Sequence, residues 1–199
     1  MKLATSVCKT INLFQSSQLM FEPYIANGLC TAGDNTTTHL QQTSDIGWYL
    51  RSVGKLYHAP ILLSCFDTIK QSLLQQQGMS IDVIVQDLAA LGQVNLENLD
   101  SSNTHIVPAE RAAMYHAVAQ TALQRANELC GYIHRHDLAR LITVKPPING
   151  NDIIKLFPRL IRNRIKDVLE TEIRYMATHP AATKQDIEEH LLEVYSMDR

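Results

Sequence analysis

The sequence predicts an all-α protein, and three observations support this fold class. Apolar residues recur at intervals of three and four in successive segments, which is the spacing of one face of a helix. No segment shows the sustained alternation of β-branched and polar residues that is typical of strands. Proline, glycine and short polar clusters separate the segments where helix caps are expected. With 199 residues, of which 45% are hydrophobic and 19% charged, the chain is long enough to bury a core.

The first part of the chain is expected to hold two helices joined by a long loop. Apolar spacing predicts a helix over residues 3–21, and Pro23 is expected to stop it. Residues 23–44 are rich in glycine, asparagine and threonine and therefore predict a surface loop. Ser44 or Asp45 is placed to cap the next helix, because either side chain accepts hydrogen bonds from first-turn N–H groups.

Two further helices are predicted in the next part of the chain. Pro60 suits the first turn of a helix that Gly78 ends. Ser80 and Asp82 mark the start of the next helix. A polar loop over residues 93–105 follows it. The apolar face predicted for this second helix consists of Ile81, Ile84, Val85, Leu88 and Leu91.

The longest helix is predicted to begin at Pro108 and to run to about Leu129. One of its faces is rich in alanine, which allows a second helix to approach closely. Gly131 is expected to end it, and a short helix is expected over residues 131–144. The apolar face of the long helix consists of Met114, Val118, Ala122, Leu123, Ala126 and Leu129.

The stretch KPPINGNDIIKLFP, residues 145–158, predicts a stop, a turn and a new start. Its adjacent prolines forbid continuation of the preceding helix. Asn149 is expected to cap the new helix, with Gly150 supplying a turn conformation and Asp152 a negative charge in the first turn. The proline that closes the stretch is expected to end this helix after about two turns.

Two helices are predicted in the remainder of the chain. The first covers residues 159–179 and is ended by Pro180. The second follows Thr183, which with Asp186 resembles a capping box.

The clearest charge feature is basic. If residues 159–179 are one helix, a rotation of about 100° per residue places Arg159, Arg162 and Lys166 on a single exposed face. Lys155 on the preceding helix extends this face. Such a group neutralises RNA phosphates and supplies affinity without reading sequence. The alternative is that these residues are solvated surface charges.

Two other function classes remain open. A helical protein-interaction module without RNA binding would use the apolar face of the long helix to hold a partner helix. A metal-dependent HD phosphohydrolase would use His116, the His136-Asp137 pair and Asp152, although a polar helix surface explains the same residues. The sequence contains no GxSxG, HExxH, P-loop, glycine-rich dinucleotide turn or Asp-x-Asp pair, so no catalytic residue and no metal ligand is assigned.

Composition limits the partners and the compartment. A net charge of −2 gives no overall attraction to nucleic acid or to a membrane, so binding must come from local clusters. No apolar run approaches the roughly 20 residues of a membrane span. The 4 cysteines have no CxxC spacing, which argues against a zinc ribbon or a disulfide scaffold and favours reduced thiols in an intracellular protein.

The C-terminal third carries a family resemblance. The sequence PINGNDI at residues 147–153 is followed by a short helix, a proline bend, Ile161-Arg162 and a long helix before the turn at Thr183 to Ile187. This order resembles the tail region of the CCA-adding tRNA nucleotidyltransferases, which carry a Ser/Thr-Gly-x-Asp-Ile/Leu element after a proline-rich approach. Similarity to the body domain of that family extends over residues 13–29 and 57–66.

The resemblance implies that residues 1–142 are a helical body and residues 143–199 a smaller, RNA-binding helical tail. It implies that the catalytic head lies outside this chain, which would hold tRNA while the head uses CTP, ATP and Mg²⁺ to add CCA to the 3′ end. This chain alone is expected to hold no cofactor and to be inactive. The full enzyme is expected in mitochondria, cytoplasm or nucleus. Two positions depart from the family: Asn149 replaces Ser/Thr, which preserves capping, and Arg162 stands where glycine is usual.

Overall fold

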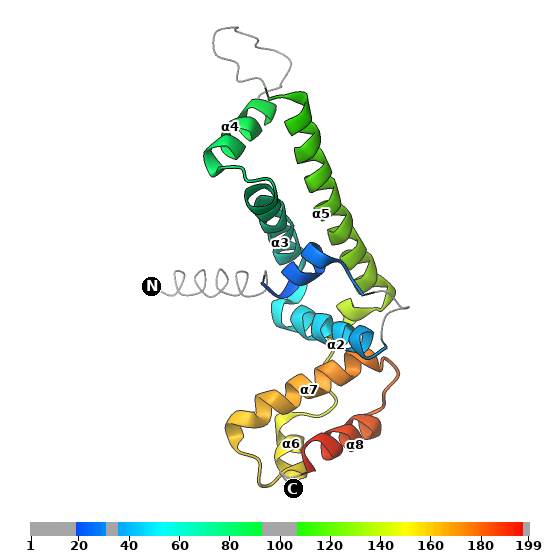
Figure 1. Cartoon of the computed structure of the whole chain (residues 1–199). Helices are drawn as coiled ribbons and strands as arrows, with labels where there is room; N and C mark the ends of the chain where they lie inside the picture. Colours follow the sequence, from blue (N-terminus) through cyan, green and yellow to red (C-terminus); the bar gives the residue numbers. More distant parts are fainter. Residues whose placement is uncertain (1–18, 31–35, 93–106, 197–199) are drawn as a thin grey trace.

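The computed structural model describes residues 19–30, 36–92 and 107–196, and in these ranges the chain is helical without strands, as predicted. The α-helices are α2 Thr36–Val53, α3 His58–Gln71, α4 Ile81–Gly92, α5 Ala109–Arg135, α6 Gly150–Leu156, α7 Ile165–Thr178 and α8 Lys184–Val194. The molecule is elongated (Figure 1). An arm of α3, α4 and α5 lies at one end, a lobe of α6, α7 and α8 lies at the other, and α2 lies between them.

Shorter helical segments complete the fold. Three are 3₁₀ turns and one, which extends α3, is a π-helical turn. They are η1 Gly54–Leu56, η2 Ser72–Gln76, η3 Leu138–Ile142 and η4 Arg162–Arg164, and η2 is the π turn. Residues 19–27 are also helical. This helix ends at Gly28, whose φ of 84° lies in the left-handed region that glycine adopts without strain.

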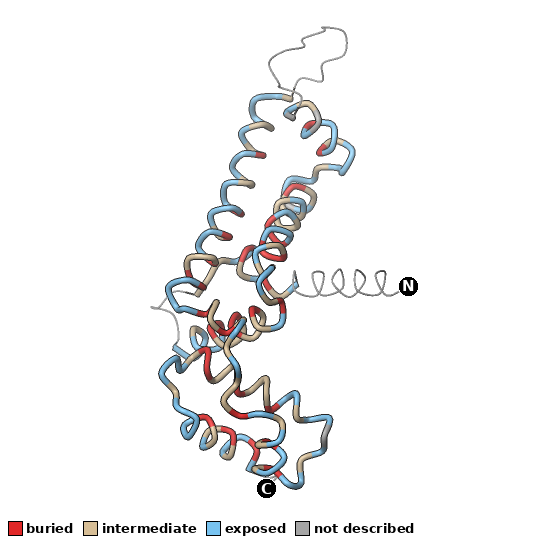
Figure 2. Tube along the Cα trace, turned by 180° about the vertical axis from the view of Figure 1, so that it is seen from behind, coloured by how far each residue is buried: buried red, intermediate tan, exposed pale blue. Residues whose placement is uncertain are grey.

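One main hydrophobic core runs through the junction. It includes side chains of residues 19–27, α2, α3, α5, η3 and all three helices of the lobe. The helix α2 packs most extensively against α7, and Figure 2 shows buried positions in the arm, at the junction and in the lobe. The parts predicted as body and tail therefore share a core that continues across residues 142 and 143.

Gly47 lets α2 and α7 approach closely. A Cβ atom at this position would lie 2.5 Å from Ala177 Cβ and 2.9 Å from Leu141 Cδ1. Both distances are below ordinary contact, and the Ala177 Cβ is fixed to the backbone of α7. Any larger residue at position 47 must therefore push the two elements apart.

Arg51 of α2 binds the segment of chain that leads from η3 toward α6. Its Nη1 donates to the carbonyl oxygens of Leu141 and Ile142 at 3.0 Å and of Val144 at 2.8 Å. These carbonyls lie at the end of η3 and just after it, where a helical segment leaves acceptors without partners in its own backbone. Arg51 thus ties the chain between the arm and the lobe to α2.

A second, smaller core closes the tip of the arm. Leu73, Ile84 and Tyr115 are buried there. The fully buried Asp87 accepts a hydrogen bond from Tyr115 Oη at 2.8 Å and lies 3.2 Å from Arg111 Nε. Burial and this hydrogen bond raise the pKa of Tyr115 to about 12. A charged pair with a phenol therefore joins α4 to α5.

The apolar face predicted for α4 is mostly exposed, contrary to expectation. Of its five members only Ile84 is buried, because α4 contacts the rest of the arm along the side that carries Ile84 and Asp87. The exposed members are Ile81, Val85, Leu88 and Leu91.

Helix caps in the lobe lie where the sequence places them. The Asn149 side chain accepts hydrogen bonds from the N–H groups of Asn151 and Asp152. The Asp152 side chain accepts one from Asn149 N–H, which completes a capping box. Thr183 and Asp186 form a second capping box at α8. These caps are decided by neighbours within three residues.

Three predicted boundaries in the first two thirds of the chain are wrong. Pro23 does not stop a helix, because the helix continues to residue 27, with Phe21 and Ile25 fully buried. The predicted loop over residues 23–44 contains the first turns of α2, so Ser44 and Asp45 lie inside a helix rather than at its start. Residues 1–18 and 93–106 lie outside the described ranges.

Gly131 likewise does not end α5, which continues to Arg135. Tyr132 and Ile133 are buried in the main core just after the glycine. The packing of these residues outweighs the cost of about 1 kcal/mol for glycine inside a helix. The short helix expected over residues 131–144 is reduced to the 3₁₀ turn η3.

The predicted helix over residues 159–179 is also shorter than expected, because α7 begins only at Ile165. Residues 158–161 form a turn and irregular chain after α6. Phe157, only 1% exposed, anchors this segment in the main core. The N–H group of Leu160 donates to the carbonyl of Phe157 at 3.0 Å. The chain thus turns after Phe157 instead of entering α7 directly.

Candidate nucleic-acid interface

The candidate interface is the connection between α6 and α7, which we call the basic loop and define as residues 155–166. It lies in the lobe, at the end of the molecule remote from α4 (Figure 1). The cap at Asn149 fixes the start of α6, and the buried Phe157 fixes its end. A hydrogen bond of 2.8 Å from Arg164 N–H to Ile161 O closes the turn before α7. The loop is therefore held at both ends.

The structure places the predicted phosphate ligands along this loop but not on one helical face. Lys155 is exposed in the last turn of α6, Arg159 is exposed in the turn after Pro158, and Lys166 is exposed in the first turn of α7. Arg162 belongs to η4, and its side chain lies outside the described part of the structure. The single stripe calculated for a continuous helix is therefore wrong, because the helix on which it depended does not begin until Ile165.

The basic loop and its approach carry a concentrated positive charge. Residues 153–166 contain two lysines and three arginines and no acidic residue. Among the described residues, no ion pair involves Lys155, Arg159 or Lys166. Exposed cations at this density suit a polyanion, since each neutralised phosphate releases counterions.

Arg164 is a member of this group that sequence reasoning did not assign. In the structure its guanidinium carbon lies 5.5 Å from the centre of the Tyr195 ring, and the residue is exposed. Tyr195 in turn packs against Phe157, with ring centres 5.8 Å apart. Tyr195 lies at the C-terminal end of α8, far from Arg164 in sequence, so no local pattern could have shown this cation–π contact.

A buried carboxyl group lies beneath the segment that leads into α6. Glu172 of α7 is 0% exposed, and its Oε1 accepts a hydrogen bond of 2.9 Å from Ile148 N–H. Burial raises the pKa of Glu172 from 4.5 to about 7, against the lowering effect of the Ile148 hydrogen bond. Two nearby charges contribute to the same pKa: that of Asp152 raises it and that of Lys184 lowers it.

The residues proposed for a metal-dependent hydrolase are not brought together. His116 and His136 lie twenty positions apart on or just beyond α5, a rise of about 30 Å at 1.5 Å per residue. His136 instead stacks on Tyr132, with ring centres 4.2 Å apart. Partial burial, followed by the charges of His39 and Arg135, lowers the pKa of His136. In the described ranges no three histidine, cysteine or acidic residues are grouped as metal ligands.

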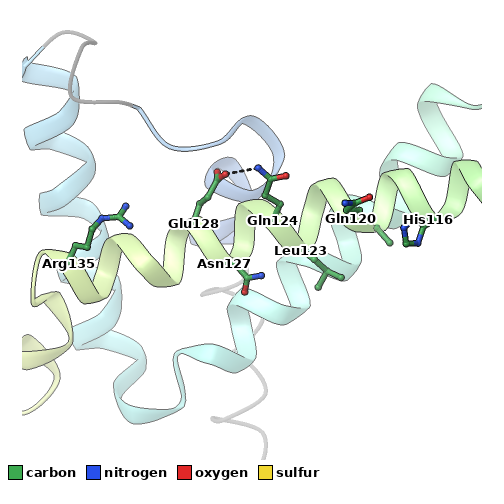
Figure 3. A pocket seen from close by; sticks show the side chains of 8 residues that line it. His116, Gln120, Leu123, Gln124, Asn127, Glu128 and Arg135 are labelled. Atoms are coloured by element: carbon green, nitrogen blue, oxygen red, sulfur yellow. Dashed lines mark hydrogen bonds between the residues drawn. The ribbon is translucent and has the colours of Figure 1, made fainter.

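A shallow depression along α5 offers no catalytic arrangement either. Figure 3 shows that its side chains come from this one helix and point in different directions. A hydrogen bond of 3.0 Å joins Gln124 to Glu128 along its rim. The lining residues are His116, Ala119, Gln120, Leu123, Gln124, Asn127, Glu128 and Arg135.

The face of α5 that was predicted to hold a partner helix is largely occupied within the chain. Ala122, Ala126 and Leu129 are buried in the main core, and α3 packs against α5. Leu123, 49% exposed, is the member of that face left at the surface. A partner helix therefore has little of this face to bind.

Comparisons with known proteins do not assign the chain to a family. Within the described ranges, no helix combines the length and the hydropathy needed to cross a membrane. A search of protein-family models, of curated proteins and of solved structures finds no match to the chain.

Proposed function

We propose that this chain binds tRNA through the basic loop, as the body and tail of a CCA-adding tRNA nucleotidyltransferase. The observation that carries the proposal is the run of five cations without an acid over residues 153–166, which spans the end of α6, the connection that follows it and the first turn of α7. A chain with a net charge of −2 gains affinity for a polyanion only through such a local concentration.

The proposed contacts are to phosphates rather than to bases. The proposed ligands are Lys155, Arg159, Arg162 and Lys166 of the basic loop. Contacts between such cations and phosphates set affinity and position without reading sequence. Asn149 and Asp152 act differently, because the capping box that they build fixes the start of α6, whose first residue is Gly150. The basic loop thus holds the RNA, and the cap holds the loop.

The chemistry is assigned to a catalytic head outside this chain. In the described ranges no cluster of carboxylates is placed to hold Mg²⁺. CTP, ATP and Mg²⁺ would act at the head, while this chain keeps the 3′ end of tRNA within its reach. We expect the reading frame upstream of this sequence to encode an Asp-x-Asp pair and a Glu-Asp-x-x-Arg element.

A salt titration of tRNA binding tests the proposal. Replacing Arg159, Arg162 and Lys166 together by alanine is expected to lower tRNA affinity by about tenfold or more at low salt. The plot of log affinity against log salt should become shallower by about two units, since each lost phosphate contact removes about 0.7–0.9. Filter binding with the full chain measures both quantities.

A control variant with the same change in net charge distinguishes the basic loop from other exposed cations. Replacing Lys55, Lys70 and Arg135 by alanine removes the same net charge at exposed positions outside the lobe. This variant should bind tRNA with nearly the wild-type affinity and slope. If the two triple variants behave alike, the basic loop is a solvated surface and the proposal is wrong.

A further inference from the structure

The buried carboxyl group of Glu172 is satisfied on one side only. Its Oε1 accepts the Ile148 N–H hydrogen bond, whereas its Oε2 is buried and has no hydrogen-bond partner in the described structure. A carboxylate with an unpaired oxygen is costly to bury, while the neutral acid costs much less. The geometry of the site therefore favours the protonated form.

The backbone that covers Glu172 is the connector between η3 and α6, residues 144–149. Its two prolines carry no N–H group, so Ile148 supplies the first N–H donor after Lys145. Both ends are held independently, by Arg51 at the Val144 carbonyl and by the capping box at Asn149. Between these two anchors, the hydrogen bond from Ile148 N–H to Glu172 joins the connector to α7.

The charged groups around Glu172 come from the helices packed against α7. Asp152 of α6 disfavours its ionisation and Lys184 of α8 favours it. The Lys184 charge is shared, because its Nζ lies 3.7 Å from both Asp152 and Glu188. From α2, Asp45 pairs with Arg174, while Arg51 is bonded to the connector carbonyls. The surroundings thus supply little positive charge to stabilise an ionised Glu172.

We propose that Glu172 is a proton-dependent latch, whose neutral carboxyl fastens residues 145–148 to α7 and whose ionisation releases them. The helices α6 and α7 are regular elements with side chains in the main core, whereas the connector is a single segment of irregular chain that enters this core through Ile148. Opening the connector is therefore the least disruptive way to admit water to the carboxylate. This segment leads directly into the capped end of α6, the helix that carries Lys155 of the basic loop. The latch does not depend on the proposed RNA binding.

The sign of the effect follows from proton linkage. The closed state binds the proton with a pKa of about 7, and a solvated carboxyl binds it near 4.5. The closed state is therefore favoured at low pH and loses this advantage as the pH rises from 4.5 through about 7. The equilibrium constant for opening should rise about tenfold per pH unit within this window, on the order of a hundredfold in total.

Residue-resolved hydrogen exchange of the Ile148 amide between pH 5 and pH 8 tests the latch. After correction for intrinsic exchange, the opening constant of the wild-type chain should rise with pH and level off above about 7. Glu172→Gln retains an acceptor for Ile148 but cannot ionise, so its opening constant should stay flat. Glu189→Gln, the same change at an exposed position of α8, should follow the wild type.

Two outcomes would overturn the latch. In one, the wild-type opening constant of Ile148 is independent of pH, a result that needs no variant to be folded. In the other, the amide of Leu129 in the main core shows the same pH-dependent rise, which would mean that ionisation acts by unfolding the whole chain. A flat Leu129 profile together with a rising Ile148 profile supports local release.

Discussion

Replacing Gly47 by alanine is expected to destabilise the protein, because overpacking this close contact has a steric cost of about 2–3 kcal/mol, the upper part of the usual range. The new Cβ atom would lie 2.5 Å from Ala177 Cβ and 2.9 Å from Leu141 Cδ1, and the first of these atoms cannot rotate away. This cost exceeds the gain of about 1 kcal/mol from removing glycine from a helix interior. Urea denaturation with a fixed slope would measure the change.

A second substitution separates this steric effect from helix propensity. Ala177→Gly removes the clashing atom, so the double variant should recover much of the stability lost in Gly47→Ala. The coupling free energy of the pair should therefore be favourable and about 1–3 kcal/mol. Gly131→Ala is the matched control, because its Cβ would meet only the mobile end of Arg135 at 3.2 Å. Equal effects of alanine at positions 47 and 131 would contradict close packing at the junction.

Replacing Arg51 by methionine is expected to destabilise the protein by about 2–3 kcal/mol, a typical value for hydrogen bonds from a charged donor. The carbonyls of Leu141, Ile142 and Val144 would lose their shared donor while remaining partly buried. Thermal and urea unfolding of the variant would measure this loss.

A conservative variant and a control define the origin of the Arg51 effect. Arg51→Lys keeps the charge but not the planar donor group, so an intermediate loss of stability is expected. Lys55→Met changes an exposed cation a few residues away, in η1, and should alter stability by less than about 0.5 kcal/mol. If Arg51→Met and Lys55→Met have equal effects, the hydrogen bonds to the carbonyls contribute little.

The local features of the lobe were predictable because each depends on neighbours in sequence. Asn149 and Thr183 cap their helices through side chains and N–H groups within three residues. The end of α6 before Pro158 follows from the missing proline N–H group. The basic character of residues 153–166 is likewise visible in the sequence alone.

The candidate interface was predictable in composition but not in geometry. The calculated stripe assumed that Arg159 and Lys166 share a helix, and the burial of Phe157 turns the chain between them. The position of Arg164 over Tyr195 depends on a contact between residues 31 positions apart. Periodicity within one segment contains no information on such contacts.

The sequence by itself determined the helical class, the caps of α6 and α8 and the concentration of cations, because short-range spacing and hydrogen bonding decide these features. Only the tertiary structure decided that helices continue through Pro23 and Gly131, that Gly47 admits α7 and that Glu172 is buried beneath Ile148. The physical reason is that each of these depends on burial against segments distant in sequence. Such burial outweighs a local preference of a few kcal/mol or less.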